Sequence, residues 1–108
     1  MSIDPTQAVN FIKENAKAYA IAKGNAAYTD NYLKVVKAKQ MNASGSSSLG
    51  AKEADAYASP EYQTAILANQ AAIEEEAHLR WLLTAAQARI EVWKVEQYSL
   101  RQEMKNLG

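Results

Sequence analysis

Cysteine is absent from the 108 residues of this chain, and proline and glycine together number only six. Without cysteine there can be no disulfide, no thiol nucleophile and no zinc–thiolate site. No stretch approaches the roughly 18 apolar residues that a membrane-spanning helix needs. The start, MSIDPTQAV, also lacks the basic and apolar regions of a signal peptide. We therefore expect a soluble, cytoplasmic protein that does not enter a membrane.

An excess of charge of one sign is lacking too, because 12 basic and 12 acidic side chains give a net charge of zero. Such a chain has no general attraction to nucleic acid or to an anionic membrane. The charges are unevenly placed, with a net +3 over residues 1–43, −5 over residues 44–79 and +2 over residues 80–108. This layout suits helices that fold against each other or against a second copy of the chain.

Alanine is the abundant residue, with 21 copies, and it is the best helix former. Alternating β-branched runs, which indicate strands, do not occur in the sequence. The predicted fold class is therefore all-α, and a chain of this length forms a single domain over residues 1–108.

The first helix is predicted over residues 5–41. Asp4 can cap it, Pro5 can occupy its first position without loss of a hydrogen bond, and Gln7 can complete a capping box. Apolar residues then recur at helical spacings of three and four or their sums. Gly24 is the weak point, since an interior glycine costs about 1 kcal/mol relative to alanine. One helix that bends at Gly24 is the preferred interpretation, and two shorter helices are the alternative.

The rest of the chain predicts a loop, a short helix and a very long helix. Residues 42–50, NASGSSSLG, are the low-complexity stretch and are expected to form a flexible loop. Residues 51–58 can form about two helical turns. Ser59 and Pro60 then repeat the pattern of a helix start, and the next glycine is the last residue of the chain. The long helix is predicted over residues 60–106.

A heptad-like seam runs along this long helix from Tyr62 through Ile66, Ile73 and Ala86 to Leu107. Its steps are of three and four residues, which is the spacing of coiled coils. Because a lone hairpin of two such helices cannot enclose its apolar surface, we predict self-association. The simplest form is an antiparallel pair of hairpins that makes a four-helix bundle, and larger assemblies remain open. The residues expected at subunit or partner interfaces are Glu76, Arg80, Trp81, Leu83, Ile90 and Trp93.

Polar residues interrupt the seam and could specify how the helices pair. Glu76 and Arg80 lie four apart, in the favourable order for an ion pair within one helix. Buried ion pairs add little stability but can set register and partner choice. A half-exposed pair at the edge of the seam is the alternative. Asn69 and Gln97 could specify the pairing in the same way.

The stretch EEEAHLRW contains the single histidine of the chain and suggests a metal site. Glu75 and His78 are three apart and share a helix face, as in the Glu-x-x-His motifs of di-metal bundles. Such a bundle needs two of these motifs, so a homodimer would have to supply the second. His78 also lies about 140° around the helix from Ile73, away from the centre of the seam. We therefore expect a solvated or interface charge cluster, with no metal and no cofactor.

The basic patch with aromatic neighbours consists of Lys34, Lys37 and Lys39, near Tyr28 and Tyr32. Single-strand binders combine positive charge with stacking rings, so a nucleic-acid-binding accessory protein is an alternative function. Lysines near the end of a helix are more often solvated and favourable to its dipole. Whether the chain contacts nucleic acid therefore stays open.

Catalytic patterns are missing from the sequence, which has no Ser/His/Asp arrangement and no glycine-rich phosphate loop. We therefore expect that the protein is not an enzyme.

Trp93 lies on the seam and is predicted to belong to the core. Trp81 lies off the seam and is the better candidate for a contact with a subunit or a partner.

Three stretches, DPTQAVNFIKENA, AYASPEY and EEEAHLRWLLTAAQARIEVW, resemble a group of small proteins of tailed bacteriophages and prophages. The resemblance covers most of the chain apart from the SGSSSLG loop. Genes of that group lie in early clusters with recombination and single-strand-binding proteins, which implies a role in phage DNA recombination, replication or host takeover. The expected function is therefore non-enzymatic. We expect a self-associating helical protein that binds a phage or host protein through a face including Trp81 and the acidic turn 74–78.

Overall fold

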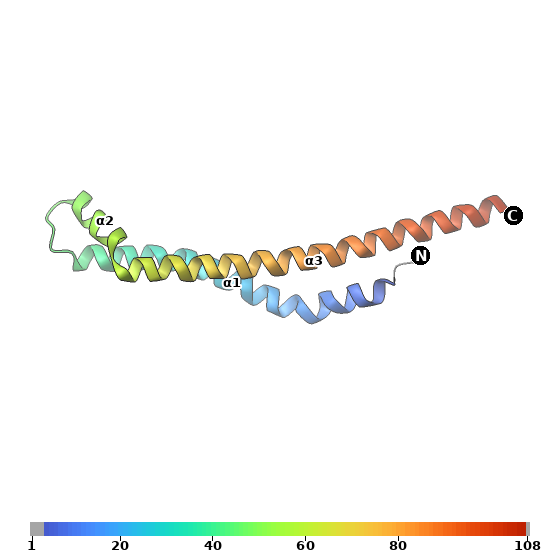
Figure 1. Ribbon diagram of the computed structural model, residues 1–108, viewed down its shortest axis with the longest axis horizontal. Coiled ribbons are helices and arrows are strands. Elements are labelled where there is room, and N and C mark those ends of the chain that lie inside the picture. The colour runs from blue at the N-terminus through green and yellow to red at the C-terminus, as the bar shows by residue number, and fades with distance from the viewer. Residues whose placement is uncertain (1–3, 108) are drawn as a thin grey trace. The chain divides into compact units, whose positions relative to one another are not determined.

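The computed structural model describes residues 4–107 and places almost all of them in helices (Figure 1). The helices are α1 (Pro5–Ala43), α2 (Leu49–Ala58) and α3 (Pro60–Leu107). Together they make these residues 93% helical and leave no strand among them. The order of long, short and long helices confirms the all-α prediction.

The loop between α1 and α2 is shorter than the sequence pattern predicts. Residues 44–48 separate the two helices, whereas the predicted loop spans 42–50. The helix α2 begins early because Ser48 is its N-cap, with its Oγ accepting a hydrogen bond of 3.2 Å from the Ala51 amide. A cap of this kind starts a helix even where serine and glycine dominate the composition.

The helix α1 runs unbroken through Gly24, which decides between the one-helix and two-helix interpretations. Its start follows the predicted pattern, since Oδ1 of Asp4 accepts a hydrogen bond of 2.9 Å from the Thr6 amide. This bond from the Thr6 backbone holds the pKa of the Asp4 carboxyl below its ordinary value. The ionised carboxylate therefore caps the positive end of the helix dipole.

The substitution Gly24→Ala should stabilise the protein by about 0.5–1 kcal/mol. Gly24 has no positive φ, and an added methyl group would meet no atom within 4 Å. Urea and thermal unfolding of both proteins would measure the gain. The matched control is Ala27→Gly at an exposed position of α1, which should lower stability by a similar amount. If Gly24→Ala were destabilised, α1 would need glycine at this position.

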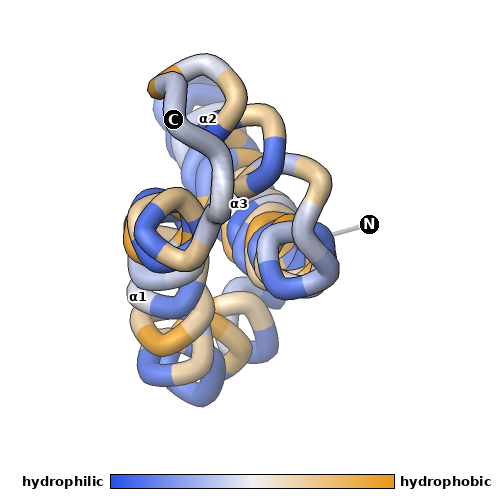
Figure 2. The backbone as a smooth tube through the Cα atoms, turned by 90° about the vertical axis from the view of Figure 1, so that its left-hand side faces the viewer, coloured by the Kyte–Doolittle hydropathy of each residue, from blue (hydrophilic) through white to orange (hydrophobic). Residues whose placement is uncertain are grey.

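Within the described residues the chain forms two compact units, each combining a stretch of α1 with a stretch of α3. Unit 1 contains residues 4–19 and 78–107, and unit 2 contains residues 20–77, including α2. Hydrophobic and hydrophilic residues are interspersed around the helices (Figure 2). Each unit therefore has narrow apolar strips to bury.

The core of each unit consists mostly of small side chains, and no large side chain among residues 4–107 is fully buried. In unit 1, Ala8 of α1 and Ala86 of α3 are only 4% and 6% exposed. Alanines at such positions allow close approach of the two helices, because interaxial distance depends on the side chains at the contact. The buried apolar residues of unit 2 are Ala22, Val36, Ala56 and Ala65.

A polar bridge joins α1 and α3 inside unit 2. Asn69, which is 9% exposed, donates a hydrogen bond of 2.9 Å from Nδ2 to Oγ1 of Thr29. The Thr29 hydroxyl in turn donates to the backbone carbonyl of Asn25 at 2.9 Å. A shifted alignment of the helices would leave the buried Asn69 amide without this partner, which costs free energy. The bridge therefore favours one register within the unit.

The loop before α2 is tied to that helix by Asp55. The hydroxyls of Ser44 and Ser46 both donate to Oδ2 of Asp55, over 2.6 and 2.8 Å. These two hydrogen bonds, that of Ser44 first, hold the pKa of the Asp55 carboxyl below its ordinary value. The serines of the low-complexity stretch thus have a structural role in capping and anchoring.

The substitution Asp55→Asn should destabilise the protein at neutral pH, and the difference should disappear in acid. Because the folded-state pKa of Asp55 is lowered, its stabilisation is present above the unfolded pKa and is lost as pH falls through the folded pKa. The gap between the two melting temperatures should therefore be full above the unfolded-state pKa of Asp55 and should close as the pH falls through its lower folded-state pKa. Ser46→Ala should act in the same direction. A gap that is unchanged at low pH would contradict the role of the ionised carboxylate.

Candidate functional site

An exposed apolar strip lies on the part of α3 that belongs to unit 1. Trp81, Val92 and Val95 are 63%, 45% and 65% exposed, and Ala88 between them is also exposed. Positions 81, 88, 92 and 95 are spaced by seven, four and three, so they share one side of the helix. The buried Ala86 lies about 200° around the helix from Ala88, so this side faces away from the core. We call these four residues the outer face.

Trp81 has a charged neighbour that holds a position over its ring. The Arg80 guanidinium lies 5.6 Å from the centre of the indole ring, which is cation–π geometry. The ring nevertheless remains largely exposed. An exposed amphipathic ring with a cation over its face is the type of group that forms the anchor of a protein interface.

The predicted interface residues divide into two groups in the structure. Leu83, Ile90 and Trp93 are half-buried in unit 1, whereas Arg80 and Trp81 are exposed. Leu83 lines a groove with Ile12, Ala16 and Tyr19 of α1, so part of its surface serves the hairpin itself. The sixth predicted residue, Glu76, is half-buried in unit 2.

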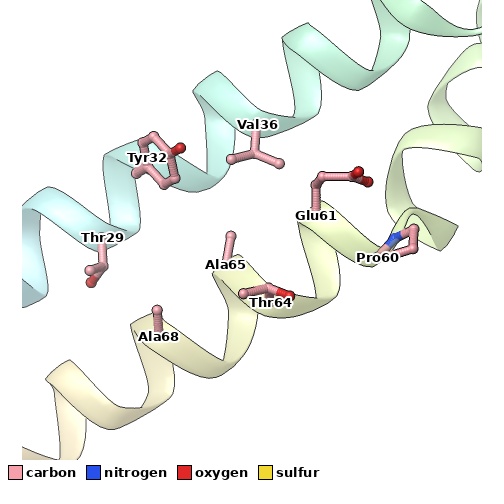
Figure 3. Close-up of a pocket in the computed structure, with 8 residues that line it drawn as sticks. All are labelled: Thr29, Tyr32, Val36, Pro60, Glu61, Thr64, Ala65 and Ala68. Carbon is pink, nitrogen blue, oxygen red and sulfur yellow. The ribbon is translucent and has the colours of Figure 1, made fainter.

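Grooves run between α1 and α3 in both units. Groove A, in unit 2, has a volume of about 450 Å³. Val36 of α1 and Ala65 of α3 point toward one another there (Figure 3). Small side chains form much of its wall, and Glu61 is the one acidic residue among those that line it. The residues that line groove A are Thr29, Tyr32, Val36, Pro60, Glu61, Thr64, Ala65 and Ala68.

Unit 1 carries two further grooves, on different flanks of α3. Groove B has a volume of about 300 Å³ and is lined by Gln7, Ala8 and Phe11 of α1 and by Leu82, Ala85, Ala86 and Arg89 of α3. Groove C has a volume of about 310 Å³ and is lined by Ile12, Ala16 and Tyr19 of α1 and by Arg80, Leu83, Thr84 and Gln87 of α3. The sequence pattern did not predict any of the three grooves.

The Glu75 and His78 pair lies on an exposed part of α3, with both residues in solvent. Among residues 4–107, no group of three or more His, Cys, Asp or Glu side chains is placed to hold a metal ion. The structure therefore adds no third ligand to the two that the sequence suggested.

The three lysines of the basic patch have different surroundings in unit 2. Nζ of Lys37 lies 4.9 Å from the centre of the Tyr57 ring and 3.6 Å from Oε1 of Glu53. The Tyr57 side chain, followed by Glu53, raises the pKa of Lys37. Lys34 and Lys39 are exposed and lie about 140° apart around α1, because each residue turns the helix by about 100°. The three lysines therefore do not share one face.

The aromatic rings near those lysines form a stacked pair. The rings of Tyr28 and Tyr32 lie 5.9 Å apart at an angle of 13°. Each ring thus already covers one face of the other, although Tyr28 remains 65% exposed. Binding of nucleic acid at this place stays a prediction.

No protein-family model matches the chain, and neither do curated proteins or solved structures. Within the part of the chain that the structure describes, no helix is both long and apolar enough to cross a membrane.

Proposed function

We propose that this protein is a non-enzymatic helical binding module that recognises a protein partner through the outer face of α3. The supporting observation is the position of Trp81, which is 63% exposed on a helix side that also carries Val92 and Val95. Tryptophan is the type of residue most enriched among the anchors of protein interfaces. An apolar strip at these spacings fits recognition in which a helix lies in the groove of its partner.

The charge of unit 1 suggests what kind of groove would fit. Its described residues carry seven basic and five acidic side chains, counting His78 as neutral. The exposed Arg80 beside Trp81 adds a positive group at the edge of the outer face. An apolar groove with an acidic rim would therefore be complementary to it.

The resemblance to small bacteriophage proteins extends the proposal to a biological setting. The partner would then be a phage or host protein of DNA recombination, replication or host takeover. This extension depends only on the resemblance, whereas the binding surface follows from exposure and helical spacing.

A photo-crosslinking experiment tests the proposed surface. A benzophenone amino acid replaces Trp81 in one variant and Arg101, which is exposed and lies about 200° around α3 from Trp81, in a control variant. Each is irradiated in a bacterial lysate. We expect a discrete adduct from position 81 that is absent from position 101 and is competed away by unmodified protein. Identical adducts from both positions would contradict the proposal.

A further inference from the structure

Unit 2 carries an exposed heptad pattern on α1, separate from its core. The steps of this pattern alternate between four and three, which is the spacing of a helix that packs against another helix. Each member comes directly before a buried or half-buried residue of α1, so the pattern lies about 100° around the helix from the core. We call it the α1 stripe, and all of its members are exposed: Ile21, Asn25, Tyr28, Tyr32, Val35 and Lys39.

The helix α3 has a corresponding pattern on the same flank of unit 2. Its members, in steps of three and four, also come directly before buried or half-buried residues. Because residues of both patterns line groove A, the two patterns lie on the two sides of that groove (Figure 3). We call the second pattern the α3 stripe, and its members are Glu61, Thr64, Ala68, Ala71 and Glu75.

The two stripes differ in the size of their side chains. Four members of the α1 stripe are large hydrophobic residues that are 39–65% exposed. The central members of the α3 stripe are a threonine and two alanines. A surface with a ridge of large side chains on one helix and a row of small ones on the other is complementary to itself, provided that the ridge of one copy meets the row of the other.

The opposite flank of unit 2 is covered by α2 at the end next to the loop. Nζ of Lys37 lies 4.9 Å from the centre of the Tyr57 ring, and Nε2 of Gln63 donates a hydrogen bond of 2.9 Å to the Tyr57 carbonyl. Lys37 and Gln63 come directly after the core residues Val36 and Tyr62, whereas members of the stripes come directly before such residues. The helix α2 therefore leaves groove A open to a further neighbour.

We propose that two copies of this chain associate through groove A, with the α1 stripe of each copy against the α3 stripe of the other. The two-fold axis runs parallel to the helices, so the two copies of unit 2 form a four-helix bundle in which neighbouring helices are antiparallel. The interface is isologous, so every contact occurs twice. A second copy is therefore the occupant of groove A.

The register of this bundle is that of the hairpin itself, because rotation about such an axis keeps each residue at its own level. Within the hairpin, Thr29 lies level with Asn69 through their hydrogen bond, and Val36 points toward Ala65 (Figure 3). In the dimer, α1 of one copy and α3 of the other keep this antiparallel pairing. The levels of the contacts across the interface follow from these two pairs.

Large side chains meet small ones in this register. Tyr28 and Tyr32 lie level with Ala71 and Ala68 of the other copy. The two tyrosine rings are already stacked on each other, 5.9 Å apart, so little conformational freedom is lost when they pack on the alanines. A copy turned end over end would instead set α1 against α1 and α3 against α3, with rings opposite rings and alanines opposite alanines. Size complementarity therefore selects the parallel axis.

The charges of the two stripes agree with the same arrangement. Lys39 lies level with Glu61 of the other copy, which gives two ion pairs across the interface. These four charges alternate in sign around the bundle, so like charges are diagonal to each other. The remaining charged member, Glu75, lies near the level of Asn25 of the other copy, whose side chain is an uncharged amide. No member of the α1 stripe therefore faces a like charge on the α3 stripe of the other copy.

This inference uses unit 2 alone, whereas the proposed function uses the outer face in unit 1. A dimer that binds no partner would overturn only the proposed function. A monomer that still forms the Trp81 adduct would overturn only the dimer.

Substitution of Ala68 tests the position of the interface. Sedimentation equilibrium should show a wild-type dimer at micromolar concentration, and Ala68→Glu should weaken it at least roughly tenfold, because its carboxylate would be buried against Tyr32 of the other copy. The matched control is Ala27→Glu, at an exposed position of α1 on the opposite flank, which should leave the dissociation constant unchanged. Far-UV circular dichroism shows whether each variant keeps its helices.

Charge reversal tests the register. Lys39→Glu and Glu61→Lys should each weaken the dimer roughly tenfold, because each turns two attractions into repulsions. An equimolar mixture of the two variants should recover the wild-type affinity, since opposite charges face each other again in the mixed dimer. The wild-type dissociation constant should also increase with salt.

Disulfide formation gives an independent test, because the chain has no cysteine of its own. Mild oxidation should join Val35→Cys chains to Thr64→Cys chains. Neither variant should crosslink alone, because equivalent positions are diagonal in the bundle. A mixture of Ala27→Cys and Gln70→Cys chains, which carry their thiols on the opposite flank, should stay separate.

Three results would overturn the proposal. The first is a wild-type monomer at micromolar concentration. The second is an equal dissociation constant for Ala68→Glu and Ala27→Glu, or a mixture of the charge variants that stays as weak as its components. The third is crosslinking of the Ala27 and Gln70 pair rather than the Val35 and Thr64 pair, which would place the interface on the opposite flank.

Discussion

Replacement of Trp81 by alanine should weaken binding of the partner by at least roughly 30-fold, which corresponds to a hot-spot loss of about 2 kcal/mol. The indole ring is 63% exposed, so it contributes little to the core of unit 1. The free energy of unfolding should therefore change by no more than about 0.5 kcal/mol. Calorimetric titration with the partner captured by crosslinking measures the first quantity, and urea unfolding measures the second.

A matched control separates the loss of an anchor from the loss of any exposed aromatic ring. Tyr28 is 65% exposed but lies in unit 2, outside the outer face, so Tyr28→Ala should leave partner binding unchanged. Trp81→Phe should retain part of the affinity, because it keeps a ring at the same position. Equal affinity of Trp81→Ala and wild type would show that the partner does not contact this face.

Replacement of Ala86 by leucine should destabilise the protein by about 1–3 kcal/mol, because overpacking forces neighbouring groups apart. Ala86 is 6% exposed and lines groove B together with Ala8, which is 4% exposed. A larger side chain at this point separates α1 from α3 within unit 1. Urea unfolding gives the change in free energy, and far-UV circular dichroism shows whether the helices persist.

The control for Ala86→Leu adds the same atoms two residues further along α3. Ala88 is exposed, so Ala88→Leu should change stability by less than about 0.5 kcal/mol. Equal effects of the two substitutions would show that close approach of the helices at Ala86 does not limit stability. A stabilised Ala86→Leu would show that groove B has room for the added side chain.

The helix starts were predictable because they depend on groups close together in the sequence. Asp4 reaches the amide of Thr6, and Ser59 Oγ accepts a hydrogen bond of 3.2 Å from the amide of Tyr62. Each contact spans two or three residues, so composition and order are enough to indicate it. The extent of the loop was less predictable, because Ser44 and Ser46 serve an aspartate on the following helix.

The seam of α3 was predictable in outline but not residue by residue. Asn69 and Ala86 lie on it and are buried, whereas Ile66 and Ile73, also on it, are 38% and 50% exposed. A straight helix turns by about 20° relative to each heptad, so a strict heptad pattern drifts around its surface. Which member of the pattern is buried then depends on the residue of α1 that lies opposite.

The candidate surfaces, like the seam, were only partly predictable from the sequence. Trp81 was expected to lie off the seam from its phase alone, and the structure places it in solvent. The grooves are bordered by residues from two helices, for example Ala8 with Ala86, and no pattern within one helix could reveal them.

The sequence by itself determined the fold class, the helix starts and the uneven charge of α3, because these follow from neighbouring residues and from helical periodicity. The tertiary structure decided which alanines form the core, which apolar residues stay exposed and where the grooves lie. These features depend on contacts between residues far apart in the chain, such as the hydrogen bond from Asn69 to Thr29. Local signals specify helices, whereas the pairing of helices specifies the surfaces that remain for a partner or a second copy.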